Sequence, residues 1–128
     1  WPGVDHNPDL HQTMIRLERF KGRFTIRRKK SAIASLDIPA HSMDFVYLDA
    51  DHRKEAVAQD LRNWYPTIRP GGMMAGHDFA NRERMSDTLI RFGVKEAVHE
   101  FIWSLGILID LFIAVDEGES ATWYFVKP

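Results

Sequence analysis

The chain has 128 residues, a length that suits one domain. With 45% hydrophobic and 27% charged residues, a buried core is expected and a disordered chain is excluded. Seventeen basic and eighteen acidic residues leave a formal charge of -1, and cysteine is absent. These counts give no global electrostatic case for binding nucleic acid or an anionic membrane, and they exclude disulfides, thiolate metal sites and cysteine nucleophiles.

The most apolar stretch, residues 101–115, contains Asp110 and is shorter than the roughly 20 apolar residues that a transmembrane helix needs. No basic region followed by an apolar one stands at the start, so no secretory signal is predicted. We therefore expect no membrane partner and a cytoplasmic location. The sequence opens at Trp1 instead of methionine, which suggests that other residues precede it.

The first forty residues predict two helices and a strand. Apolar residues recur at spacings of three and four, as on one buried helical face, at Leu10, Met14, Leu17 and Phe20. The β-prone run 24–26 indicates a strand that ends at the basic cluster 27–30. Residues 31–36 fit one or two helical turns.

The middle of the chain alternates apolar runs with a helix. Residues 44–48 form a nearly continuous apolar run, which is typical of a strand covered on both faces. Residues 53–68 predict an amphipathic helix, closed by Pro70-Gly71-Gly72. A second apolar strand follows at 73–75.

After Gly93, residues 94–105 predict a third helix, and 111–115 predict another buried strand. A β-branched and aromatic run at 122–126 predicts a final strand, paired with the preceding one as a hairpin. This alternation predicts an α/β fold with a Rossmann-like, mostly parallel sheet and an antiparallel C-terminal hairpin, all within one domain over 1–128.

Polar clusters follow two of the expected strands, and the carboxyl ends of parallel strands are where such sheets carry function. The clusters contain carboxylates and imidazoles that can bind a divalent cation, and these are Asp49, Asp51, His52, His77 and Asp78. Neighbouring parallel strands would place both clusters in one crevice. The alternative is that Asp49 and Asp78 only cap the helices that follow and that the histidines are ordinary surface residues.

Several motifs in order resemble the class I S-adenosylmethionine-dependent methyltransferases, and especially the branch that includes sugar O-methyltransferases. They are Asp44-Phe-Val-Tyr-Leu-Asp-Ala-Asp-His52, Asp60-Leu-Arg-Asn-Trp64, Arg69-Pro-Gly-Gly72, Ala75-Gly-His-Asp-Phe79 and the terminal Ala121-Thr-Trp-Tyr-Phe-Val-Lys-Pro128. The resemblance covers the chain from about His11 onward. It implies methyl transfer from S-adenosylmethionine to a hydroxyl of a small molecule or sugar.

The same resemblance implies a sheet with strands in the order 3-2-1-4-5-7-6, in which strands 4 and 5 end at Asp49 and Asp78. The chain departs from the family because no Gly-rich turn follows a first strand before Phe24. The expected fold therefore lacks the first strand and its cofactor loop. We expect this partial domain to bind the cofactor very weakly or not at all, and to self-associate through the open edge at 45–48.

The resemblance also assigns cofactor contacts. Asp5 takes the family's ribose-binding role if residues 1–5 end strand 2; alternatively, Trp1 lies beyond that strand and the acidic residue comes earlier. Ser31 falls where relatives contact the adenine end, although Lys30 replaces the usual acidic neighbour. Asp49 is expected to contact the cofactor as well.

Metal-dependent members of the class hold a divalent cation, such as Mg²⁺, with residues that end strands 4 and 5. Carried over, these are Asp49, His77 and Asp78, where the histidine replaces a carboxylate that is common in relatives. The family's general base maps onto His52, and histidine changes its charge nearest to neutral pH.

Two other interpretations remain open. A metal-dependent phosphoesterase also uses Asp and His at strand ends, although its paired metals usually need more histidines. The other alternative is a truncated domain without activity.

The basic cluster 27–30 is expected to be a solvated edge and not a nucleic-acid site. The choice of acceptor is expected to depend on the loop 79–93 and on N-terminal elements, and a homo-oligomer is compatible with the sequence.

Overall fold

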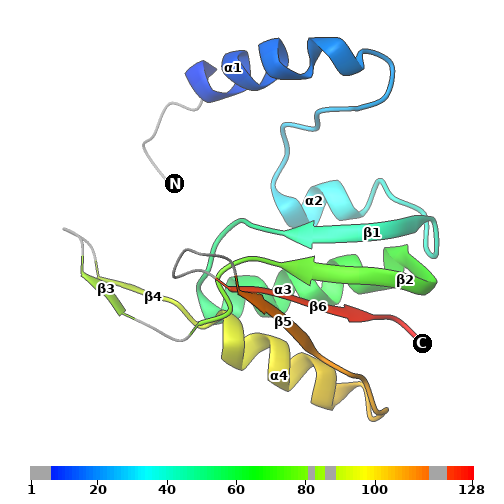
Figure 1. Ribbon diagram of the computed structural model, residues 1–128, viewed down its shortest axis with the longest axis vertical. Helices are drawn as coiled ribbons and strands as arrows, with labels where there is room; N and C mark the ends of the chain where they lie inside the picture. Colours follow the sequence, from blue (N-terminus) through cyan, green and yellow to red (C-terminus); the bar gives the residue numbers. More distant parts are fainter. Residues whose placement is uncertain (1–6, 81–82, 86–88, 116–120) are drawn as a thin grey trace.

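The computed structural model describes residues 7–80, 83–85, 89–115 and 121–128. A four-stranded mixed sheet lies at its centre (Figure 1), in the order β1 (Met43–Leu48), β2 (Ile68–Gly76), β6 (Ala121–Val126) and β5 (Phe112–Val115). The pair β1 and β2 is parallel, while β6 runs antiparallel to both β2 and β5. This is the 4-5-7-6 part of the strand order that the family resemblance implies, and the α/β class and the C-terminal hairpin are confirmed. Within the described part, antiparallel pairs outnumber the parallel one.

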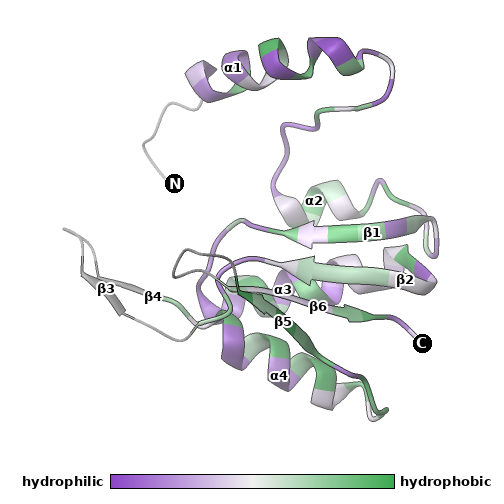
Figure 2. Ribbon diagram, viewed as in Figure 1, coloured by the Kyte–Doolittle hydropathy of each residue, from purple (hydrophilic) through white to green (hydrophobic). Residues whose placement is uncertain are grey.

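Helices α3 (Lys54–Trp64) and α4 (Val94–Ser104) pack against the sheet, and the short helix η2 (Tyr65–Thr67) leads from α3 into β2. Apolar residues gather along β2, β5 and β6 and on part of α4 (Figure 2). The core between these elements is made of Val46, Val57, Leu61, Ile68, Met74, Val94, Ala97, Val98, Phe101, Trp123 and Phe125. None of the helices in the described ranges is long and apolar enough to cross a membrane.

The prediction that both faces of strand 44–48 are covered is wrong. Val46 points into the core, but Phe45 and Tyr47 are 49% and 44% exposed. All four residues of β5 are exposed as well, so the buried strand expected at 111–115 is an exposed edge strand. On β1 the described core lies on one face of the sheet, so side chains of the opposite pleat meet solvent. On β5, which lies at the edge of the sheet, side chains of both faces are exposed.

The N-terminal part differs most from expectation. Helix α1 (Asn7–Leu17) and the turn η1 (Glu18–Phe20) form as predicted, but no residue in either is buried. In Figure 1, α1 lies apart from the sheet. The strand expected at 24–26 is not formed, although β1 has an open edge; α2 (Ser31–Ser35) follows as predicted.

The end of one helix and the start of one strand differ from the sequence prediction. Helix α3 ends at Trp64, and β2 begins at Ile68 and not at Met73. The register between β1 and β2 shifts after Met43, where the Pro-Gly-Gly sequence bulges. Within the segment 79–93, β3 (Glu83–Met85) and β4 (Leu89–Arg91) form a small antiparallel hairpin, where only a loop was expected.

Gly76, the last residue of β2, lies so close to neighbouring strands that a side chain does not fit there. A Cβ at this position would lie 2.5 Å from Trp123 Cζ2 and 2.7 Å from the Leu48 carbonyl oxygen. We therefore expect Gly76→Ala to lower the free energy of unfolding by about 1–3 kcal/mol, measured by urea denaturation. Combining it with Trp123→Leu should cost less than the sum of the two single changes, because the smaller side chain removes the clash. Strictly additive effects would contradict this explanation.

Candidate functional site

The site lies where β1 and β2 end side by side. Leu48 pairs with Gly76 in the parallel register, and the His77 backbone N–H donates to the Leu48 carbonyl at 3.0 Å. Asp49 and His77 therefore leave neighbouring strand ends at the same edge of the sheet. The structure brings the two polar clusters of the sequence into one place.

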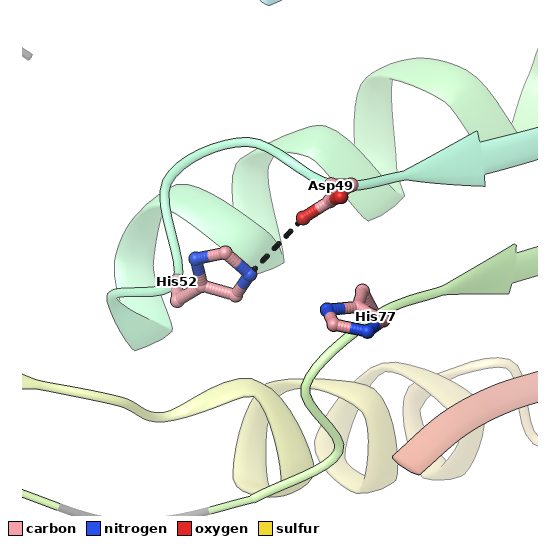
Figure 3. A group of neighbouring side chains, drawn as sticks. All are labelled: Asp49, His52 and His77. Atoms are coloured by element: carbon pink, nitrogen blue, oxygen red, sulfur yellow. Dashed lines mark ion pairs between the residues drawn. The ribbon is translucent and has the colours of Figure 1, made fainter. Parts of the chain in front are cut away.

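His52 is at the centre of the site. Its Nε2 atom lies 3.4 Å from Asp49 Oδ1 and 3.4 Å from Asp78 Oδ2. His77 Nδ1 lies 3.6 Å from Asp78 Oδ1. Figure 3 shows the side chains of Asp49, His52 and His77 turned toward a common point. The side chain of His52 is 16% exposed and that of Asp49 is 53% exposed, so the group is open to solvent on the Asp49 side.

The loop after β4 positions His52. The Phe92 ring stacks on the imidazole with centroids 5.1 Å apart, and the Gly93 N–H donates to the His52 carbonyl at 2.9 Å. A Cβ on Gly93 would lie 2.6 Å from Lys54 Cβ, so the close approach of this segment requires glycine. The sequence analysis did not predict a role for Phe92, because in the sequence it is only an apolar residue shortly before a helix.

The capping alternative is not what the structure shows. The N-cap of α3 is Arg53, with no side-chain cap bond, and no described helix follows Asp78 directly. The carboxylate used at the start of α3 is that of Asp51, which accepts from the Arg53 backbone N–H at 3.0 Å and also from its guanidinium. The Arg53 hydrogen bonds lower the pKa of Asp51.

Asp78 has an unusual backbone. Its φ of 50° lies in the left-handed region, which aspartate tolerates better than most residues. This conformation places its carboxylate within reach of both His52 and His77. Backbone strain of this kind is concentrated at functional sites, so it supports a functional interpretation of the Gly-His-Asp sequence.

The donor atoms suit a divalent cation. Single ligand atoms of Asp49, His52 and His77 all lie within 4.8 Å of one another. Nitrogen and oxygen ligands in such a mixture bind first-row metals and, with more carboxylate, Mg²⁺. The Nε2 atom of His52 is buried and has no hydrogen-bond partner within the described residues. A nitrogen that lies beside two carboxylates without a hydrogen bond fits either a metal ligand or a general base.

An open groove beside β1 contains two of the three expected cofactor residues. Ser31 and Asp49 both line it, together with Phe45, Asp60 and Trp64. The Ser31 hydroxyl accepts a hydrogen bond from Trp64 Nε1 at 2.8 Å. Burial raises the pKa of Asp60, and a hydrogen bond from Ser31 partly offsets that effect. The third expected residue, Asp5, lies outside the described residues.

The basic cluster at 27–30 is partly neutralised. Arg27 and Lys29 both bond to Asp37, at 3.0 Å and 2.5 Å, and these contacts, led by Lys29, lower the pKa of Asp37. All four side chains are exposed, as expected for a solvated edge.

Comparison with known proteins supports the fold. Residues 2–79 match the family model described as a methyltransferase domain. No match was found among curated proteins. A solved structure from Bordetella parapertussis, provisionally named as an exported protein, is 14% identical with a TM-score of 0.63, and the alignment covers 98% of this chain and 52% of that one.

Two other solved structures carry methyltransferase names. A provisionally named O-methyltransferase from Klebsiella pneumoniae is 18% identical with a TM-score of 0.61, covering 98% of this chain and 59% of its own. A provisionally named DNA modification methylase from Thermus thermophilus, complexed with S-adenosyl-L-methionine, is 14% identical with a TM-score of 0.53, covering 77% of this chain and 51% of its own. The chain thus spans about half the length of these structural relatives, and at such identities the likeness concerns the fold.

Proposed function

Because the chain belongs to the methyltransferase-domain family, we propose that it contributes the catalytic half of an S-adenosylmethionine-dependent methyltransferase that acts on a hydroxyl of a small molecule or sugar. The observation that carries this proposal is the position of His52, whose Nε2 lies 3.4 Å from carboxylates at the ends of both parallel strands. Family membership favours this activity over a phosphoesterase, which the Asp and His residues alone would also allow.

Methyl transfer needs alignment and the removal of one proton. S-adenosylmethionine, when bound, supplies a methyl group that its sulfonium centre already activates. His52 then takes the hydroxyl proton at Nε2 while the acceptor oxygen forms its bond to the methyl carbon and the carbon–sulfur bond breaks. Where no cation neutralises them, Asp49 and Asp78 would stabilise the imidazolium that results, because both carboxylates lie beside Nε2.

Asp49, His77 and Asp78 are proposed to hold a divalent cation such as Mg²⁺. A cation there would orient a vicinal diol and lower the pKa of its hydroxyl. The clustering of ligand atoms around Asp49 and His77 supports this assignment, and it also allows His52 as a ligand in place of Asp78. The two roles of His52 predict different effects of the same substitution, which are set out in the Discussion.

We assign Ser31 and Asp49 to the cofactor side of the site, with Asp5 as a third contact, because Ser31 and Asp49 line one groove. A small-molecule acceptor is favoured over nucleic acid. The near-zero net charge and the pairing of the basic cluster with Asp37 both support that choice, although one structural relative is named a DNA modification methylase.

The proposal is tested by transfer of a labelled methyl group to a panel of vicinal diols and sugars. Activity is expected with Mg²⁺ or Mn²⁺ present and is expected to fall when a chelator removes the cation. Transfer that is insensitive to chelation would remove the metal from the proposal and leave the base. Transfer to DNA or RNA, but not to the diols, would contradict the acceptor class.

We expect the 128-residue chain to bind the cofactor only weakly. The groove is bounded by β1, whose outer edge has no partner strand in the described ranges and whose Phe45 and Tyr47 are largely exposed. A cofactor there would be covered on one side only. Isothermal titration should give a dissociation constant weaker than the low micromolar range, which corresponds to about -8 kcal/mol. Tight binding would show that the groove is a sufficient cofactor site as it stands.

A further inference from the structure

A buried indole N–H under the site has no partner. Trp123 is 1% exposed, and its Nε1 atom makes no hydrogen bond within the described residues. Indole N–H groups can only donate, and buried donors in native proteins are nearly always paired. The proposed function uses the unpartnered nitrogen of His52, but it does not use Trp123. This donor therefore needs a separate explanation.

The indole borders a small cavity. Its Cε2 and Cζ2 atoms lie against Gly76, the residue before His77, and Nε1 is bonded to Cε2. The cavity has a volume of about 10 Å³, and its lining includes Val57 and the polar side chains of Asp51, His52, Asp60, His77 and Trp123. About 10–15 Å³ is the smallest space that holds one water molecule, provided that two or more polar groups face it. The lining meets both conditions.

Asp60 offers the matching acceptor. It is 8% exposed and lies on α3, across the cavity from β6. A carboxylate has about four acceptor positions, and the Ser31 hydroxyl uses one of them. The other carboxylate in the lining, that of Asp51, already accepts several hydrogen bonds from Arg53.

We propose that this cavity binds one ordered water, which accepts a hydrogen bond from Trp123 Nε1 and donates one to the Asp60 carboxylate. Together with the contacts of Ser31 to Asp60 and Trp64, the water completes a hydrogen-bonded chain from β6 through α3 to α2. This chain holds Ser31 at the wall of the groove beside β1. Asp60 and Trp123 are then positioning residues. The water site itself does not depend on methyl transfer.

A crystal structure of the 128-residue chain at high resolution is the direct test. It should show a water within about 2.7–3.2 Å of both Trp123 Nε1 and an Asp60 carboxylate oxygen. Density for a direct Trp123–Asp60 hydrogen bond, or no water in contact with Nε1, would overturn the proposal.

Stability measurements separate a wet cavity from a dry one. Val57→Ile adds a methylene to the lining, which would raise the urea midpoint if the cavity were dry and lower it if a bound water is displaced. We expect it to fall. Trp123→Phe and Asp60→Ala should each lower the midpoint, and the double variant should lower it by less than the two shifts added together, because both remove a partner of the same water. Trp103→Phe is the control, since Trp103 is 86% exposed. A higher midpoint for Val57→Ile, or additive shifts, would contradict the water site.

Discussion

Replacing His52 with alanine is expected to reduce the rate of methyl transfer by about 10²–10⁴ while leaving cofactor binding almost unchanged. The expected loss is that of a general base, because Nε2 lies at the paired strand ends, 3.4 Å from Asp49 and 3.4 Å from Asp78. The groove lined by Ser31 and Asp49 does not include His52, so the cofactor should not sense the change. The rate is measured with the best acceptor of the diol panel at saturating cofactor.

His11→Ala is the matched control, since His11 is exposed on α1 and lies far along the chain from the site. It should leave the rate unchanged. Full activity of His52→Ala at neutral pH would show that another group, or solvent, removes the proton. A variant that loses cofactor affinity to the same extent as rate would instead indicate a binding role for His52.

The sequence predicted those elements whose pattern is local. Helices α3 and α4 and the hairpin of β5 and β6 were expected, because each combines its own periodicity with a glycine or a polar turn at its ends. Burial was predicted less well. Residues 24–26 and 44–48 both have a composition that favours strands, but only 44–48 forms one, paired with β2 on a single side, because strand formation and burial depend on packing against other elements. Among the described residues no strand pairs with the outer edge of β1, so β1 is an edge strand.

For the site as well, residues next to a locally recognisable element could be predicted, whereas contacts from distant elements could not. Asp49, His77 and Asp78 could be placed together because each immediately follows a recognisable strand and because parallel strands end at the same edge. Phe92, Asp60 and Trp123 could not be predicted, since they reach the site or its floor from three separate elements. Asp60 and Trp123 stand within motifs that resemble the methyltransferases, but the resemblance assigns them no role, and Phe92 shows only as an apolar residue before a helix. Contacts between distant elements depend on exact packing, which composition and spacing do not encode.

Replacing Asp49 with alanine is expected to weaken divalent-cation binding by at least about 10–100-fold, the loss that even a change outside the inner ligand set of a metal site typically causes. Asp49 is the most exposed of the grouped ligands and comes from β1, whereas His77 comes from β2, so its loss removes one whole side of the site. Titration with Mn²⁺, followed calorimetrically, measures the change. Asp44→Ala is the control, because Asp44 lies near the other end of β1 and pairs with Arg69.

The same titration decides between the two roles open to His52. If His52 acts as the base and Asp78 completes the metal ligands, His52→Ala keeps its Mn²⁺ affinity and loses only rate, while Asp78→Ala loses affinity. If His52 is itself a ligand, as the 4.8 Å grouping with Asp49 and His77 allows, His52→Ala should lose affinity together with Asp49→Ala. We expect the first result, because the resemblance to metal-dependent methyltransferases assigns the base to His52 and the third metal ligand to Asp78. Unchanged Mn²⁺ binding in the Asp49→Ala, His77→Ala and Asp78→Ala variants would exclude a cation held by these strand ends.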